Sequence, residues 1–157
     1  MVGKGTAQKR LAVMLLWMLA LSTFLHLPDC HAGTIVFYDT KGLERCKFVT
    51  ELAVTESQHA RGLMHRVSLR DDTGMLFIFN NEELRHFWMR NTLIPLDLVF
   101  IDSQRIVVSV HCDARPLDES AITSRFPARY VLEINAGLVS KCGIGSGMRV
   151  RFDNLPQ

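Results

Sequence analysis

The sequence has little of what marks the best-known catalytic and metal-binding classes. Its four cysteines form no CxxC pair and it contains no HExxH segment, which excludes the common dithiol and zinc-hydrolase signatures. The glycines of the segment 143–147 are not followed by the Lys-Ser/Thr ending of a phosphate loop, so that type of nucleotide site is excluded too. Repeats and low-complexity tracts are also lacking. We therefore expect no cofactor and no motif-defined metal site.

The chain also lacks an excess of charge once its first residues are set aside. The whole chain holds 18 Lys and Arg residues and 16 Asp and Glu residues. Without Lys4, Lys9, Arg10 and Asp29, the segment 33–157 retains 15 residues of each sign. Nucleic-acid recognition rests on a basic surface, so this neutral segment predicts no nucleic-acid partner.

One long hydrophobic run is present, at the N-terminus. A basic stretch over residues 4–10 precedes an almost wholly apolar segment over 11–27, and Cys30 and Ala32 place small residues near a cleavage position. This pattern predicts a secretory signal peptide over residues 1–32, cleaved after Ala32, and a periplasmic or secreted protein. Two alternatives stay open: an uncleaved membrane anchor, and a lipoprotein cut at Cys30. After cleavage, no other run is long enough to span a membrane.

Three cysteines follow the leader, namely Cys46, Cys112 and Cys142. In an exported protein, an odd number implies at least one free thiol or an intermolecular bond. We interpret all three as small apolar residues of a core. One disulfide stays open as the alternative, since the sequence does not choose a pair.

Short strands separated by turns dominate residues 33–157, which are enough for a single domain. The segments 80–83 and 113–128 are polar and are predicted to be loops. The pattern predicts a mainly β, compact domain of the β-sandwich or barrel-like type, with one or two short helices. Strands are predicted at residues 34–38, 46–54, 75–79, 87–91, 96–101, 106–111, 129–135 and 148–152.

One helix is predicted directly after the second of these strands. Thr55 and Gln58 match a capping box, which marks a helix start. Gly62 weakens that helix by about 1 kcal/mol relative to alanine, so we expect it to permit a close backbone approach. A second turn or short helix is predicted after Ala136.

The segment 87–97 concentrates residues that suit a ligand pocket. Read as a strand, it projects Trp88, Arg90 and Thr92 to one side and Asn91 to the other. An aromatic ring beside an arginine is typical of sugar stacking or anion binding. The alternative is a core tryptophan beside a solvated arginine.

Asp97 is predicted to be buried. Both alternating faces of 96–101 are apolar, which indicates a central strand with Asp97 at its start. A buried carboxylate must be paired or hydrogen-bonded, so we interpret Asp97 as the partner of an arginine. The candidate partners are Arg61, Arg66 and Arg90.

Glu133 points inward if its neighbour Val131 does, because alternate residues of a strand share a face. Two inward carboxyl groups give an alternative hypothesis, a hydrolase that uses Asp97 and Glu133 as acid and base.

A further alternative is copper handling, because methionine and histidine suit Cu(I) in an exported protein. The residues in question are Met64, Met75, Met89, His65 and His86.

Four ordered blocks of the sequence resemble the domain of unknown function 192 family over about residues 46–152. They are 60–66 (ARGLMHR), 74–77 (GMLF), 87–97 (FWMRNTLIPLD), and 131–137 with the later glycines. The resemblance implies a compact, mainly β domain, often exported in bacteria, and no known activity. The family-like positions to test are Arg61, Met64, Arg66, Trp88, Asn91, Asp97 and Glu133.

The leading hypothesis is a non-catalytic periplasmic binding or accessory module. Its partner would be a small molecule, an envelope glycan or a periplasmic protein, and no motif predicts an enzyme. The candidate ligand-binding residues are Arg61, Met64, Arg66, Trp88, Arg90, Asn91 and Asp97.

Overall fold

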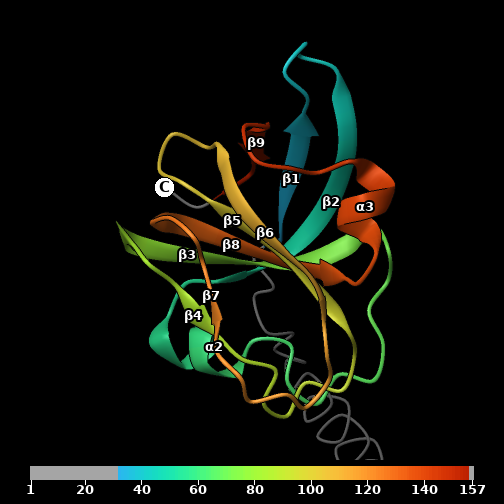
Figure 1. Ribbon diagram of the computed structural model, residues 1–157, viewed down its shortest axis with the longest axis vertical. Coiled ribbons are helices and arrows are strands. Elements are labelled where there is room, and N and C mark those ends of the chain that lie inside the picture. Colours follow the sequence, from blue (N-terminus) through green and yellow to red (C-terminus); the bar gives the residue numbers. More distant parts are fainter. Residues whose placement is uncertain (1–31, 156–157) are drawn as a thin grey trace, which may run out of the picture.

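The computed structural model describes residues 32–155, so the predicted signal peptide lies outside the described residues except for Ala32 (Figure 1). This part of the chain holds nine strands and two short helices. In chain order they are β1 (Ala32–Tyr38), β2 (Glu44–Ala53), α2 (Glu56–Arg61), β3 (Thr73–Glu83), β4 (His86–Phe87), β5 (Leu96–Ile101), β6 (Val107–Ala114), β7 (Ile122–Thr123), β8 (Ala128–Asn135), α3 (Leu138–Cys142) and β9 (Arg149–Asp153).

Seven strands form one mixed sheet in the order β6-β5-β8-β3-β2-β1-β9. Neighbours are antiparallel except β2 and β3, which are parallel and joined through α2. The two edges of the sheet meet at one bridge, between Ile106 and Arg149, without closing into a barrel. Strands β4 and β7 pair separately and lie beside α2 (Figure 1). The predicted mainly β single domain is confirmed.

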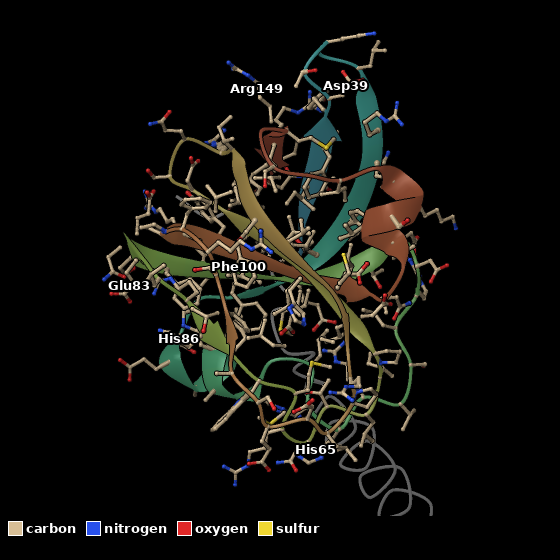
Figure 2. All side chains as sticks on the ribbon, viewed as in Figure 1. Asp39, His65, Glu83, His86, Phe100 and Arg149 are labelled. Carbon is tan, nitrogen blue, oxygen red and sulfur yellow. A yellow bond between two sulfur atoms is a disulfide. The ribbon has the colours of Figure 1, made fainter. Side chains whose placement is uncertain are left out.

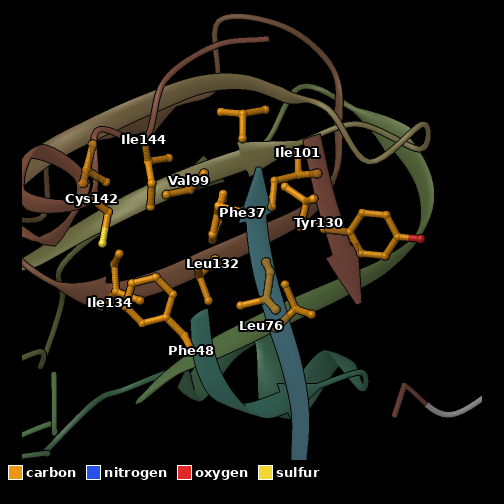
Figure 3. Packing of buried hydrophobic residues seen from close by; sticks show 14 of the residues in the cluster. Phe37, Phe48, Leu76, Val99, Ile101, Tyr130, Leu132, Ile134, Cys142 and Ile144 are labelled. Carbon is orange, nitrogen blue, oxygen red and sulfur yellow. The ribbon is translucent and has the colours of Figure 1, made fainter. Parts of the chain in front are cut away.

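The central strands supply side chains to two apolar clusters. Val99 and Leu132 belong to the first, called here the Phe37 cluster, which the residues of α3 also join (Figure 3). Leu98 belongs to the second, called the Phe100 cluster. All six residues of β5 are buried, which confirms the central strand predicted from its two apolar faces.

The capping box at the start of α2 is confirmed. The Thr55 hydroxyl accepts the Gln58 N–H at 3.3 Å, and the Gln58 side chain accepts the Thr55 N–H at 2.9 Å. The helix ends at Gly62, whose φ of 46° favours glycine. The predicted close approach at Gly62 is to side chains rather than to backbone. A Cβ atom there would lie 3.2 Å from the Phe77 ring and 3.7 Å from a Glu133 carboxyl oxygen.

Three predicted segments differ from the structure. The predicted loop 113–128 holds β7, which pairs with β4, and it overlaps the end of β6 and the start of β8. β3 continues through the predicted loop 80–83, where the buried Arg85 neutralises Glu83 and donates to the Asn81 side chain. The predicted strand 87–91 is wrong beyond Phe87, because the chain turns there. The predicted alternation of Trp88, Arg90 and Thr92 therefore does not occur.

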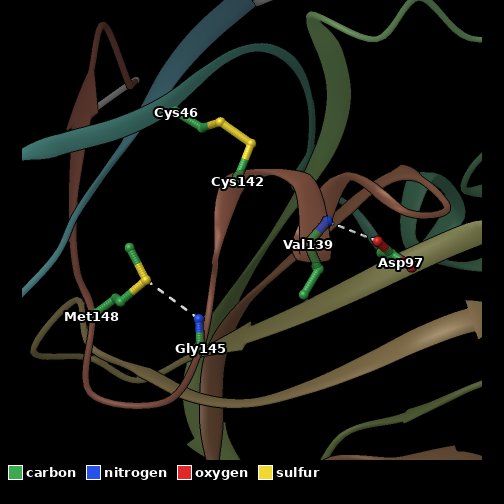
Figure 4. Close-up of a disulfide and its surroundings, with 6 residues drawn as sticks. All are labelled: Cys46, Asp97, Val139, Cys142, Gly145 and Met148. Atoms are coloured by element: carbon green, nitrogen blue, oxygen red, sulfur yellow. Dashed lines mark hydrogen bonds between the residues drawn. A yellow bond between two sulfur atoms is a disulfide. The ribbon is translucent and has the colours of Figure 1, made fainter.

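The interpretation of the three cysteines as small apolar core residues is wrong for Cys112, which is exposed, whereas Cys142 is buried in the Phe37 cluster and Cys46 packs against it. The alternative of one disulfide is confirmed. Cys46 on β2 and Cys142 at the end of α3 form a disulfide, with a Cα–Cα distance of 5.8 Å (Figure 4). They are 96 positions apart in the chain, so only the tertiary fold selects the pair. Cys112 is a free and exposed thiol. No helix in residues 32–155 is long and apolar enough to cross a membrane.

Candidate functional site

A pocket of about 260 Å³ opens on the side of the sheet that carries the Phe100 cluster. Its walls come from α2 and the turn after it, from β3, and from the chain around β4. We call it the Trp88 pocket. Figure 2 labels two residues of its wall, Glu83 and His86, on the same side of the molecule.

Aromatic side chains form one wall of the Trp88 pocket. The Phe87 ring lies edge-on to Phe77, with centroids 5.1 Å apart, and edge-on to Phe79 at 6.5 Å. Such contacts fix ring orientation and add to the stabilisation from burial. Trp88 also lines the pocket and remains 48% exposed, so one of its surfaces is available for contact.

Glu83 and Arg85 form a charged pair in the pocket wall, and Arg85 also bonds to nearby backbone carbonyls. Arg85 is buried, and its guanidinium lies 3.8 Å from the centroid of the Phe79 ring. It donates to the Ala128 carbonyl at 2.9 Å and to the Glu83 carboxylate at 2.6 Å. A further nitrogen donates to the backbone carbonyl of Asn81. These contacts hold the Arg85 guanidinium against the end of β3.

His59 at the end of α2 is held in place over the same wall. Its Nε2 lies 2.9 Å from the Ala53 carbonyl, which accepts only, so this nitrogen carries the proton. The ring centroid lies 4.4 Å from that of Phe79. These contacts hold the imidazole at the pocket, and its Nδ1 has no hydrogen bond within residues 32–155.

Glu133 lines the pocket from β8. It pairs across the sheet with Met75 on β3 and Leu98 on β5, both apolar, and is 5% exposed. Within residues 32–155, its carboxyl group has no hydrogen bond and no ion pair. Burial raises the pKa of Glu133 to about 8, because desolvation disfavours the charged form. The inward direction predicted from Val131 is confirmed, and the raised pKa favours the neutral acid at pH 7.

Asp97 is buried as predicted, but not beside an arginine. Its carboxylate accepts the Asp113 N–H at 2.9 Å. It also accepts the Val139 N–H at 2.8 Å, as Figure 4 shows. The predicted partner Arg66 instead forms a bidentate pair with Glu51, with both distances 2.5 Å. The salt-bridge interpretation of Asp97 is therefore wrong, and its charge is stabilised by backbone donors.

Asp97 and Glu133 lie on opposite faces of the sheet. Asp97 is paired with Ile134, and Glu133 with Leu98. Because paired residues share a face and successive residues alternate, the two carboxyl groups point away from each other. They do not form the acid and base pair of the hydrolase alternative.

The remaining candidate residues divide between the pocket and its surroundings. Arg61 and Met64 line the pocket together with Trp88. Arg90 lies outside the lining, with its guanidinium 5.5 Å from the centroid of the Trp88 ring. Asn91 adopts a φ of 54° in a turn, and its carbonyl accepts the N–H of His65.

The residues of the copper alternative divide among the pocket, the Phe100 cluster and a turn. Met75 and Met89 are buried in the Phe100 cluster, and Met64 and His86 line the pocket. His65 lies in a turn with a φ of 63°. In the described part of the chain, no group of three or more His, Cys, Asp or Glu residues is placed to hold a metal ion.

The family model of DUF192, described as an uncharacterised ACR, matches residues 38–152. The chain belongs to the DUF192 family. No curated protein matches it. Its fold is similar to a crystal structure from Sinorhizobium meliloti 1021, provisionally described as a transcription regulator, with a TM-score of 0.75 and 38% identity over 79% of this chain and 95% of that chain.

A second similar structure is a protein of unknown function from Novosphingobium aromaticivorans DSM 12444. It has a TM-score of 0.74 and 38% identity, over 80% of this chain and 89% of that chain.

Residues of the DUF192 blocks of the present chain play two different structural roles. Asp97 and Asn135 hold backbone, the latter by donating to the Leu69 carbonyl at 2.8 Å, whereas Trp88 and Glu133 face the pocket.

Sequence reasoning missed several residues of the pocket. Phe77 and Phe79 alternate with Met75 on β3, so the shared face of these three was readable from the sequence. His59 and Arg85 gave no such signal. Their positions depend on where α2 ends and on the pairing of β3 with β8, and both are set by the tertiary fold.

Proposed function

We propose that this DUF192 protein is a non-catalytic binding module whose small-molecule ligand enters the Trp88 pocket. The main support is that family-like residues from three separate sequence blocks line the same pocket. These residues are Arg61 and Met64 from the first block, Trp88 from the second and Glu133 from the third.

The aromatic part of the pocket lining supports a binding role. Ligand sites are mostly apolar and aromatic, with few polar groups that orient the ligand. Phe77, Phe79 and Phe87 supply a rigid apolar wall, and Glu133 supplies an unpaired polar group at depth. The volume of about 260 Å³ lies near the small end for ligand sites, so the pocket suits a molecule with one ring.

We place this module outside the cytoplasm. The basic and apolar leader of the sequence supports export. The disulfide between Cys46 and Cys142 also supports it, because such bonds persist in oxidising compartments. The description of the Sinorhizobium relative as a transcription regulator would instead make DNA the partner. The equal numbers of acidic and basic residues in 33–157 do not favour that partner.

A thermal-shift and amide-NMR screen of the purified protein tests the proposal. The probes are acetophenone, benzoate, benzylamine, N-acetylglucosamine, phosphate and Cu(I). A ligand at 100 times its Kd stabilises the folded state by about 2.7 kcal/mol, which moves the Tm by several degrees. We expect at least one organic probe to shift the amide signals of the pocket wall.

Two aromatic variants make the screen specific. Trp88→Ala should weaken the bound probe by at least tenfold, about 1.4 kcal/mol. Phe126→Ala is the matched control, because Phe126 is 58% exposed and does not line the pocket. Binding that is equally strong in both variants, or that shifts signals around Asp97 instead, contradicts the proposal. An N-acetylglucosamine response that needs Trp88 would identify the ligand as a glycan.

A further inference from the structure

Glu133 is the one carboxyl group on the Trp88 pocket that the described residues leave without a partner. The other, Glu83, is paired with Arg85. Glu133 is more than nine-tenths buried, and its nearest cross-strand neighbours, Met75 and Leu98, carry no donor N–H or O–H in their side chains. No buried side-chain oxygen or nitrogen atom among the described residues lacks a hydrogen bond, so the unpartnered oxygens of Glu133 are atoms that reach the open space of the pocket.

The charges around the pocket decide which form of Glu133 a ligand meets. Glu83 and Arg85 cancel each other. Arg61 lines the pocket, is exposed, and has no ion pair among residues 32–155. With Glu133 in its neutral form, the lining carries a net positive charge at pH 7. This environment disfavours a cationic ligand and favours one that presents an acceptor oxygen.

We infer that the pocket binds a small aromatic or similarly flat apolar molecule through a carbonyl or carboxylate oxygen, to which the Glu133 carboxyl group donates its O–H. This inference rests on the proposed function and names its ligand class. The aromatic wall contacts the body of the ligand, and the acid at depth orients its oxygen. Gly62 leaves the space beside the Glu133 oxygen open, because a Cβ there would lie only 3.7 Å from it.

The acid form of Glu133 has a measurable consequence for binding. The donated proton must be present, so affinity should be constant below the pKa of about 8 and fall by up to tenfold per pH unit above it. Other groups near Glu133 also titrate or carry charge, and a control must separate them. Helix α2 supplies His59 and Arg61, and the β3–β4 region supplies Glu83, Arg85 and His86. Glu51 lies on β2, its partner Arg66 follows α2, and His111 lies on β6.

Four probes that share one ring separate the chemistries. Acetophenone presents a neutral carbonyl, benzoate a carboxylate, benzylamine a cation, and toluene no acceptor. We expect acetophenone and benzoate to bind in the wild-type protein at pH 7. Toluene should bind at least fivefold more weakly, since one net hydrogen bond contributes about 1 kcal/mol.

Glu133→Gln is the decisive variant, because its amide can still donate to the oxygen but does not ionise. We expect it to bind acetophenone within a few fold of wild type and to lose the fall in affinity above pH 8. Glu133→Leu should abolish the preference for acetophenone over toluene. If Glu133→Leu does not fold, the comparison of pH profiles between wild type and Glu133→Gln still decides the matter.

The outcomes separate this inference from the proposed function. Benzylamine that binds best and gains affinity as pH rises overturns the acceptor chemistry while leaving a ligand-binding pocket. Toluene equal to acetophenone also overturns the inference alone. If none of the four probes shifts the pocket signals at any pH from 6 to 9, the inference is overturned, and the proposed function is contradicted only if N-acetylglucosamine also fails to bind.

Discussion

Asp97 and Glu133 are buried carboxyl groups on neighbouring strands of one sheet, yet their surroundings are opposite. Asp97 accepts two backbone N–H groups, from Asp113 and Val139. Glu133 accepts none among the described residues and faces a pocket. The comparison teaches that burial of a carboxyl group does not by itself mark a functional site. The state of its hydrogen bonds separates a structural group from a candidate ligand contact.

The difference follows from what each face packs against. α3 begins at Gly137, which has no side chain to cap the helix. Asp97 supplies the missing acceptor from a neighbouring strand by binding the Val139 N–H, a free donor of the first turn. Glu133 faces the end of α2 at Gly62, where a missing side chain leaves space instead of a partner.

The largest effect on stability should come from removing the disulfide between Cys46 and Cys142, which lies on the same face of the sheet as Asp97. The double variant Cys46→Ser with Cys142→Ser should lose about 4 kcal/mol of unfolding free energy, because the bond constrains a long segment of the unfolded chain. Urea unfolding measures the change, and Cys112→Ser is the control with little expected effect. If the folded double variant loses probe binding at the Trp88 pocket, the two faces are not independent.

Asp97→Asn should lower the unfolding free energy by about 2 to 3 kcal/mol. The asparagine keeps one acceptor oxygen but places an NH₂ group against a backbone donor, and an unsatisfied buried donor costs about 1–3 kcal/mol. Asp153→Asn is the exposed control, whose pair with Arg151 should contribute less than about 1 kcal/mol. Equal stability of Asp97→Asn and wild type would show that the carboxylate is not the cap of α3.

Glu133→Gln should change how stability depends on pH. The pKa of Glu133 is about 8 in the folded chain against an ordinary value of 4.5. Between these values the unfolded chain has lost the proton and the folded chain keeps it. Unfolding free energy therefore falls as pH rises, by up to about 1.4 kcal/mol per pH unit, and this contribution levels off above pH 8.

Melting curves between pH 5 and pH 9 check this prediction. Glu133→Gln should flatten the fall. A wild-type profile that Glu133→Gln leaves unaltered would show that Glu133 is ionised in the folded protein.

The smallest effect on stability is expected at the pocket rim. Trp88→Ala and Phe126→Ala should each lower the unfolding free energy by less than about 1 kcal/mol, because both side chains are about half exposed. Only Trp88→Ala should weaken probe binding. A large loss of stability in Trp88→Ala would mean that the ring supports the core.

Much of the fold was predictable, because it follows from local patterns. The two apolar faces of 96–101 predicted a central strand, and Thr55 with Gln58 predicted the start of α2. The strand predicted through Arg90 and Asn91 failed for a tertiary reason. There the Met89 N–H donates to the Asp118 carbonyl, and the chain turns at Asn91.

The candidate site was predictable only in part. Sequence blocks identified Trp88 and Glu133, and alternation gave the inward direction of Glu133. The interpretation of Asp97 as an arginine partner failed because a carboxylate can be satisfied by backbone donors, which a sequence does not display. The disulfide partner of Cys46 likewise depends on where α3 folds back over β2.

A ¹³C NMR titration of the Glu133 side-chain carboxyl in the purified protein tests the central claim most directly. The account predicts a midpoint near pH 8, assigned by its loss in Glu133→Gln. It also predicts that acetophenone moves the midpoint upward, because the ligand binds the acid form. A midpoint near 4.5, unaffected by acetophenone, would show that Glu133 is an ordinary ionised carboxylate and would contradict the account.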